Sequence, residues 1–173
     1  MYKRILVPVD GSPTSTRGLD EAIRLAKLTG ASIRLVHVLD QLAFAAGLET
    51  YAVDVFGILR DAGEKVLEQM KARVAAGGIE VSTYISEPLT GRVCDIVIDQ
   101  AKEFGADLIV LGTHGRRGVG RLFLGSDAEQ ILRGATVPVL LVRSTDAEAP
   151  AAAATVATGA ASAPVRSAAP AGA

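Results

Sequence analysis

Residues 107–126 read DLIVLGTHGRRGVGRLFLGS, which is the most informative stretch of the chain. The apolar run at 107–111 is typical of a buried strand. Five glycines and three arginines follow it, and a helical pattern then starts near Ser126. Glycine lets the backbone approach a ligand closely, and N–H groups near a helix N-terminus attract anions. The stretch therefore predicts a strand, a phosphate-binding loop and a helix in succession.

Apolar runs of strand length recur elsewhere in the chain, at Ile5–Val9, Ile33–Leu39, Val81–Ile85 and Val137–Val142. Helical periodicity lies between the runs, over Thr14–Thr29, Arg60–Ala76, Thr90–Phe104 and about Asp127–Arg133. Regular alternation of strand and helix predicts right-handed crossovers between parallel strands. We therefore expect an α/β fold with a five-stranded parallel sheet sandwiched by helices. Ligands of such sheets bind beyond the carboxyl ends of the strands.

The composition changes after Arg143. Residues 144–173 are mostly Ala with Pro, Ser, Thr and Gly, and they contain no Leu, Ile or aromatic residue. Such a segment buries too little apolar surface to offset the entropy lost on ordering. We predict one domain at 1–143 and a disordered tail at 144–173. Residues 40–57 show no clean period; they form either a lid or, as we favour, a connection that leads into the second helix.

Charge and cysteine content exclude several classes of protein. The net charge of −1 creates no field that would draw the chain onto nucleic acid or an anionic membrane. No apolar run approaches the ~20 residues of a membrane span, and the N-terminus does not have the form of a signal peptide. Cys94 is the single cysteine, which suits a reducing compartment. We expect a cytoplasmic protein that contacts neither nucleic acid nor membranes.

Two common phosphate-binding motifs do not fit the loop. Gly120 and Ser126 have the spacing of a Walker A motif, but the lysine before the serine is absent. A dinucleotide fingerprint could start at Gly118, yet Phe123 occupies the position of its third glycine. The pattern that remains is Gly112-x-x-Gly115, nine residues, then Gly125-Ser126.

This pattern resembles that of the ATP-binding subgroup of the universal stress protein family. The resemblance covers residues 2–143 and rests on several stretches in order: Ile5–Ser12, His37–Val38, Gly105–Gly115, Gly125–Ser126 and Pro138–Val142. It implies a flavodoxin-like or adenine-nucleotide-hydrolase-like fold and ATP, together with Mg²⁺, as the ligand. It also implies a homodimer that pairs the last strands, here Val137–Arg143.

The resemblance further implies a role for each matching position. Pro8, Val9 and Asp10 would border the adenosine, and Val38 would contact adenine through its backbone. The ribose and phosphates would be wrapped by the loop residues Gly112, Thr113, His114, Gly115, Arg116, Arg117 and Gly118. The triphosphate would be closed off by Gly125, Ser126 and the amides of Asp127 and Ala128.

Several of these positions also have a purely structural interpretation. Asp10 either contacts the ligand or its Mg²⁺, or only shapes a turn in which Ser12 caps the next helix and Pro13 is its first residue. Residues 126–129 have the form of a capping box with Ser126 at the cap. Asp127 either repels a triphosphate or holds Mg²⁺.

Other polar and aromatic residues are open to similar choices. His114 either donates to a phosphate or braces the loop. We expect His37 to be packed rather than catalytic, and Cys94 to be a small core residue. Tyr84 and Phe104 are expected to pack.

Two functions remain open. The first is a nucleotide-dependent regulator of the stress response. The alternative is a slow ATPase or an autophosphorylating enzyme, with Ser126 or Thr113 as acceptor. Adenylating enzymes carry Ser-Gly-Gly-x-Asp-Ser after the first strand, whereas this chain has Pro8–Ser12 there. A receiver-like module needs an aspartate at the end of the third strand, and 85–88 supply none.

Overall fold

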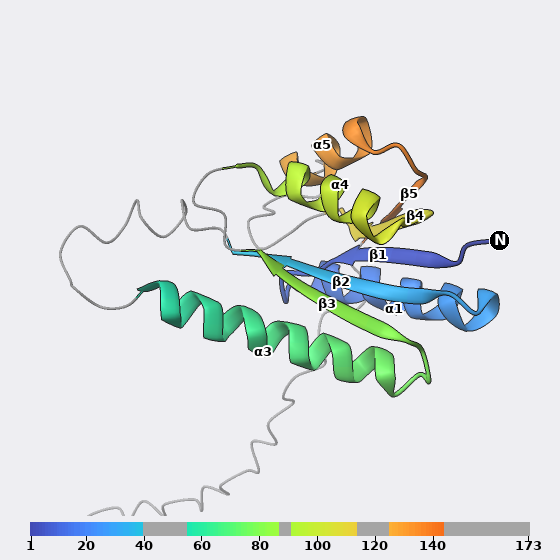
Figure 1. The fold of residues 1–173 in the computed structure, drawn as a ribbon, viewed down its shortest axis with the longest axis horizontal. Helices are drawn as coiled ribbons and strands as arrows, with labels where there is room; N and C mark the ends of the chain where they lie inside the picture. Colours follow the sequence, from blue (N-terminus) through green and yellow to red (C-terminus); the bar gives the residue numbers. More distant parts are fainter. Residues whose placement is uncertain (40–54, 87–90, 114–124, 144–173) are drawn as a thin grey trace, which may run out of the picture.

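Five strands form one parallel sheet in the computed structural model, which describes residues 1–39, 55–86, 91–113 and 125–143. In chain order the strands are β1 Arg4–Pro8, β2 Ser32–Val38, β3 Val81–Ser86, β4 Leu108–Gly112 and β5 Val139–Val142. They lie in the order β3-β2-β1-β4-β5, and each neighbouring pair is parallel (Figure 1). The predicted five-stranded parallel sheet is confirmed.

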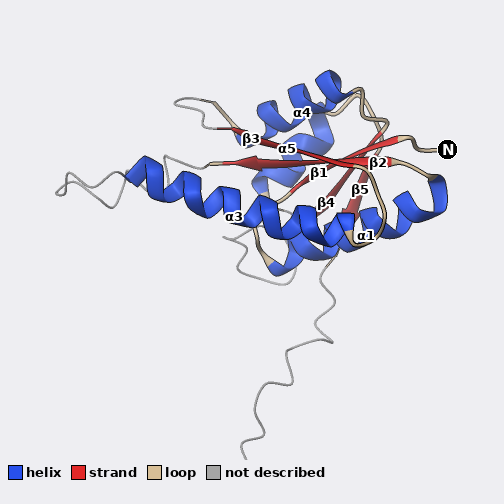
Figure 2. Ribbon diagram, turned by 60° about the horizontal axis from the view of Figure 1, so that its bottom comes forward, coloured by secondary structure: helices blue, strands red, loops and turns tan. Residues whose placement is uncertain are grey.

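The described helices cover both faces of this sheet. They are α1 Pro13–Thr29, α3 Val55–Ala75, α4 Val93–Phe104 and α5 Ser126–Gly134. Helices α1 and α3 lie on one face, and α4 and α5 lie on the other (Figures 1 and 2). The chain is therefore a three-layer α/β sandwich, as the alternation of strand and helix predicts.

Each face of the sheet has its own apolar core. Ile5 and Val7 of β1 belong to the core under α1 and α3, whereas Leu6 between them belongs to the core under α4 and α5. All three side chains are fully buried. Strands that are buried on both faces need apolar residues at every position, which is why β1 and β4 show no polar alternation.

Local signals set the limits of α1. Ser12 is its N-cap, and the Ser12 hydroxyl accepts a hydrogen bond from Ser15 N–H at 3.1 Å. Pro13 follows as the first helical residue, where its missing N–H costs nothing. The helix stops at Gly30, whose φ of 70° is left-handed and whose N–H donates to the Ala26 carbonyl at 2.8 Å. The predicted cap, the predicted first residue and the end of the helix at Thr29 are confirmed.

Other limits differ from the sequence prediction. Helix α3 begins at Val55 instead of Arg60, so 55–57 belong to the second helix, while 40–54 lie outside the described residues. Helix α4 begins at Val93 instead of Thr90, after an extended Arg92. Strand β5 begins only at Val139, because Pro138 has no N–H to donate to a ladder.

The strand order reverses direction between β1 and β4. From β1 the chain moves outward through β2 to β3, then crosses back to β4 on the other side of β1. Adjacent loops leave in opposite directions at such a switch point, and the crevice between them is the usual ligand site of open α/β sheets. The carboxyl ends of β1 and β4 are therefore where a site is expected. Within the described helices, none is both long and apolar enough to cross a membrane.

Candidate functional site

The glycine-rich loop begins and ends at the carboxyl end of β4. Thr113 follows the last residue of β4, and its N–H donates to the Val142 carbonyl of β5 at 3.1 Å. The Thr113 carbonyl in turn accepts from Gly125 N–H at 2.9 Å, directly before α5. This bond brings Gly112 and Thr113 together with Gly125 and the first turn of α5. His114, Gly115, Arg116, Arg117 and Gly118 lie outside the described residues.

Helix α1 reaches the same edge through a tight backbone contact. A Cβ added to Gly112 would lie 2.5 Å from the Thr14 carbonyl oxygen, so no larger residue fits there. A Cβ on Gly18, one turn along α1, would lie 3.1 Å from the Gly112 nitrogen. The first turn of α1 thus lies against the end of β4. The N-termini of α1 and α5, each with a partial positive charge, both start at this crevice.

Asp10 forms the turn that joins β1 to α1. Its Oδ1 accepts from Ser12 N–H at 2.9 Å, and its own N–H donates to Ser15 Oγ at 3.4 Å. A carboxylate that binds the N–H two residues on is a common way to stabilise a turn. The predicted turn at Asp10 is confirmed, while a contact of Asp10 with a ligand or a metal ion stays a prediction. Pro8 and Val9, just before it, are half-buried and buried.

The predicted capping box of α5 is wrong. Gly125 is the N-cap, Ser126 is already the first helical residue, and no side chain caps the helix. Instead of reaching back, the Glu129 carboxylate pairs with Arg133 at 2.6 Å. The helix thus starts one residue earlier than a capping box requires. Capping therefore does not explain why serine follows Gly125.

The first turn of α5 presents three residues of different exposure. Ser126 and Asp127 are exposed, whereas the methyl group of Ala128 is buried in the core under α4 and α5. Ala128 can therefore meet a ligand only through its backbone. The N–H groups of Ser126 and Ala128 are in the first turn of α5, where a helix has no acceptor of its own for its N–H groups.

Strands β1 and β2 separate at the edge where Val38 lies. Their register ends with Pro8 opposite Val36, and Val9 N–H still donates to the Val36 carbonyl at 2.8 Å. Val38 is the last residue of β2 and lies beyond this final pair. If this register is continued, Val9 lies opposite His37 and Asp10 lies opposite Val38, so Val38 borders the crevice where β1 turns away.

His37 is buried, as the sequence predicts, with 4% of its surface exposed. Its Nδ1 lies 2.7 Å from the carbonyl oxygen of Val9, which is one of the predicted site residues. No sequence pattern indicated this bond, because it depends on the register of β1 against β2.

Cys94 and Phe104 also pack as predicted. Cys94 is 3% exposed, and burial raises the pKa of its thiol, so it stays protonated and is a poor nucleophile. Phe104 packs in the core under α4 and α5, with the Arg34 guanidinium 4.5 Å from its ring centre. The prediction for Tyr84 is wrong: this ring is 37% exposed, because β3 is an edge strand of the sheet.

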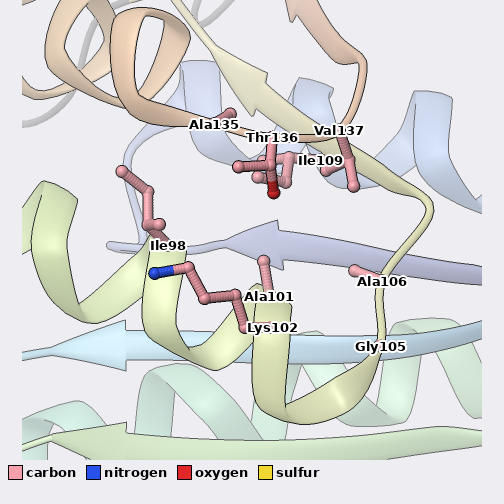
Figure 3. Close-up of a pocket in the computed structure, with 9 residues that line it drawn as sticks. All are labelled: Ile98, Ala101, Lys102, Gly105, Ala106, Ile109, Ala135, Thr136 and Val137. Atoms are coloured by element: carbon pink, nitrogen blue, oxygen red, sulfur yellow. The ribbon is translucent and has the colours of Figure 1, made fainter.

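Two hollows among the described residues lie at the opposite, amino ends of the strands. One is a cavity of about 130 Å³ between α4 and the segments that precede β4 and β5 (Figure 3). Most of its lining is apolar, including Ile98, Ile109 and Val137. The other lies between Lys3, Lys27 and Gly78, below β1, β2 and β3. Neither includes a predicted site residue, so neither is the crevice described above.

Comparisons with known proteins agree with this fold. A model of the universal stress protein family matches residues 1–143. Universal stress protein MJ0531 of Methanocaldococcus jannaschii is 32% identical over 144 residues, which cover 83% of each protein. The solved structure of MJ0577 from the same organism superposes with a TM-score of 0.73 at 26% identity, and covers 84% of this chain and 99% of that one.

A universal stress protein from Archaeoglobus fulgidus was solved in complex with dAMP. It superposes with a TM-score of 0.58 at 26% identity, and covers 81% of this chain and 97% of that one. These structural neighbours have the flavodoxin-like, adenine-nucleotide-hydrolase-like type of fold that the resemblance implied. With the sequence match over residues 1–143 and a 32% identical relative, the chain belongs to the universal stress protein family.

Proposed function

We propose that this protein binds ATP, with Mg²⁺, in the crevice at the carboxyl ends of β1 and β4, and acts as a nucleotide-dependent regulator of the stress response. The observation that carries the proposal is the bond from Gly125 N–H to the Thr113 carbonyl, 2.9 Å long, which closes the base of the loop. It holds the first turn of α5 at the switch point of the sheet, where anionic ligands are favoured. The family member with bound dAMP supports an adenine nucleotide as the ligand.

The described residues divide into two groups around such a ligand. Pro8 and Val38 lie where β1 and β2 separate, and they offer apolar surface and backbone groups to adenosine. Val9 borders the same gap, but it is buried and its N–H and C=O are bonded to Val36 and His37. The first-turn amides of α5, from Ser126 to Ala128, offer donors to phosphate oxygens. The intervening loop would complete the wrap around the ribose and phosphates.

Magnesium fits this site only alongside phosphate. Among the described residues, no group of three or more His, Cys, Asp or Glu could hold a metal ion. Mg²⁺ is usually bound by one or two carboxylates together with substrate phosphates. Asp10 or Asp127 would supply the carboxylate, and the ion would neutralise part of the triphosphate charge.

A slow ATPase or an autophosphorylating enzyme is the second candidate. The two proposed acceptor hydroxyls differ in access: Ser126 is exposed at the start of α5, whereas Thr113 is 6% exposed. If phosphate is transferred to the chain, Ser126 is therefore the acceptor to expect. Formation of ADP and a mass gain of one phosphoryl group would identify this activity.

We further propose that the chain forms a homodimer through β5. This strand is at the edge of the sheet, and all four of its residues are half-buried in the single chain. The Pro138 carbonyl accepts from Ile109 of β4, and the Val142 carbonyl accepts from Thr113 directly after β4. The backbone groups of the alternate residues Val139 and Leu141 therefore face away from β4. An edge with outward N–H and C=O groups is a template for pairing with another chain.

Mass spectrometry of nucleotide released from freshly purified protein tests the function. We expect an adenine nucleotide in the wild-type protein and little in the Gly125→Val variant. Thr136→Val, which places a valine at an exposed position beyond the C-terminal end of α5, is the matched control and should keep the nucleotide. Equal release from wild type and Gly125→Val would place the ligand elsewhere.

A further inference from the structure

The His37 imidazole donates a hydrogen bond to the backbone at the proposed site. Its Nδ1 lies 2.7 Å from the Val9 carbonyl oxygen, and both residues are buried. A carbonyl oxygen can only accept, so Nδ1 must carry the proton. The ring is thus held in one orientation, with its Nδ1–H directed at the first carbonyl after β1, just before the turn at Asp10.

The same carbonyl is the acceptor that a further rung of the β1–β2 ladder would use. Val9 N–H donates to the Val36 carbonyl at 2.8 Å. In a parallel ladder, the residue that donates to position 36 accepts from the N–H of position 38. The next rung would therefore run from Val38 N–H to the Val9 carbonyl. His37 supplies a side-chain donor to that carbonyl where the register of the two strands has already ended at Pro8 and Val36.

The backbone groups of Val38 face the crevice rather than β3. The N–H groups of Ile33 and Leu39 donate to the Glu80 and Ser86 carbonyls on the β3 side. Backbone direction alternates along a strand, so position 38 points to the side of β1, as position 36 does. Val38 therefore has an N–H and a C=O directed at the gap that opens where β1 turns away.

Helix α3 leaves space for the imidazole at Gly63. A Cβ added there would lie 2.8 Å from His37 Cδ2 and 2.8 Å from Leu39 Cδ2. Glycine inside a helix is unfavourable relative to alanine because the unfolded chain gains more freedom. The close approach of the ring explains why glycine stands in the middle of α3.

We propose that His37 is a positioning residue of the nucleotide site, which occupies the Val9 carbonyl and so leaves the Val38 N–H and C=O for the adenine base. Adenine presents a ring-nitrogen acceptor beside its N6 amino donor, which complements one N–H and one C=O of a strand. Guanine carries an O6 acceptor in place of that amino group. His37 thus acts through Val9 and Val38 on selection of the base. This inference rests on the proposed function.

Two variants of the full chain distinguish the effect of the His37 hydrogen-bond donor from the effect of the volume of its imidazole ring. In His37→Asn, the side-chain amide places an N–H donor near the position of Nδ1; in His37→Leu, the donor is lost and the apolar bulk remains. We expect His37→Leu to weaken ATP binding by at least about tenfold and to leave the affinity for inorganic tripolyphosphate unchanged. His37→Asn should bind ATP close to the wild-type level, and the preference for ATP over GTP should fall only in the leucine variant.

Amide hydrogen exchange without nucleotide gives a second readout. In His37→Leu the Val9 carbonyl is available to Val38 N–H, so exchange at Val38 should slow relative to the wild type. In His37→Asn it should stay fast. If both His37 variants unfold, Gly63→Ala, whose methyl group displaces the ring, should lower ATP affinity while tripolyphosphate binding persists.

The results that would contradict the role of His37 differ from the results that would contradict nucleotide binding. Wild-type ATP affinity in His37→Leu would overturn the positioning role and leave the proposed function intact. An equal loss of ATP and tripolyphosphate affinity, with unchanged exchange at Val38, would reduce His37 to a structural residue. If the wild-type protein binds no adenine nucleotide, the proposed function fails, and with it the role of His37 towards the base.

Discussion

Gly112 and Gly125 look alike in the sequence but have different reasons to be glycine. At Gly112, a Cβ would lie 2.5 Å from the Thr14 carbonyl oxygen, so the contact between α1 and β4 requires glycine. At Gly125, φ is −58° and ψ is 146°, a conformation open to any residue. The first glycine is needed by the fold, whereas the backbone conformation of the second does not require glycine.

Substitutions at these two glycines should therefore affect different quantities. Gly112→Ala should lower the free energy of unfolding by about 1–3 kcal/mol, because α1 must shift away from β4. Gly125→Val should leave that energy nearly unchanged and weaken ATP binding at least about tenfold, since in the proposed site its side chain would lie in the path of the phosphates. Urea denaturation and calorimetry measure the two effects. A Gly125→Val variant that binds ATP normally would argue against phosphate binding at this helix.

At the same helix, the direction in which Asp127→Ala changes the affinity for ATP reveals the role of the Asp127 carboxylate. If its carboxylate only repels phosphate, Asp127→Ala should tighten ATP binding, and more so without Mg²⁺, because the ion screens the repulsion. If the carboxylate holds Mg²⁺, the same change should weaken binding only when Mg²⁺ is present. Calorimetry with and without Mg²⁺ distinguishes the two roles. No change in either condition would exclude both.

At the scale of the elements, two serines near helix starts allow a matched comparison. Ser12 accepts from Ser15 N–H at 3.1 Å as the N-cap of α1, whereas Ser126 is already inside α5, which no side chain caps. Ser12→Ala should lower the free energy of unfolding by about 1 kcal/mol. Ser126→Ala should change it little. Urea denaturation of both variants checks the difference, and an equal loss would mean that Ser126 also stabilises its helix.

Local patterns predicted some element limits and missed others. Ser12, Pro13 and Gly30 act through the chain next to them, so their roles in α1 could be read from the sequence. The start of α5 could not, because Gly125 is held by the Thr113 carbonyl, whose position depends on β4. Interactions between elements, rather than propensity, decided that limit.

In the candidate site too, some features could be predicted from local sequence, whereas others depend on contacts between elements. Strand ends and glycine spacing are sequence features, and they were enough to indicate Pro8–Asp10, Gly112 and Gly125. The bond from His37 to Val9 depends on the register of β1 and β2, and the closeness of Thr14 to Gly112 depends on how α1 crosses β4. The prediction that Tyr84 packs failed because the sequence does not reveal that β3 is an edge strand.

For the whole molecule, the proposed dimer depends on the backbone groups of β5 that face away from β4. Backbone groups of Leu141 face away from β4, so Leu141→Pro removes an outward donor and keeps the rungs to β4. We expect light scattering to show a dimer for the wild type at micromolar concentration and a monomer for Leu141→Pro. Circular dichroism should confirm that the variant is folded. A monomeric wild type would rule out the dimer.

The predicted division of the chain into a domain at 1–143 and a tail at 144–173 implies that the tail can be removed with little effect on stability. Residues 144–173 lack the large apolar side chains that a core needs. Truncation after Thr145 should change the free energy of unfolding by less than about 1 kcal/mol, a small part of the stability of a domain. Urea denaturation of the two chain lengths measures this, and a larger loss would show that the segment packs on the domain.

Calorimetric titration of the full wild-type chain with ATP tests the proposed nucleotide site most directly. With Mg²⁺ present, we expect saturable binding of one nucleotide per chain, since each chain has one switch point between β1 and β4. AMP should compete for the same site, because the proposed site holds the adenosine end of the nucleotide beside Val9 and Val38. Absence of binding at millimolar nucleotide, both with and without Mg²⁺, would contradict nucleotide binding by this protein.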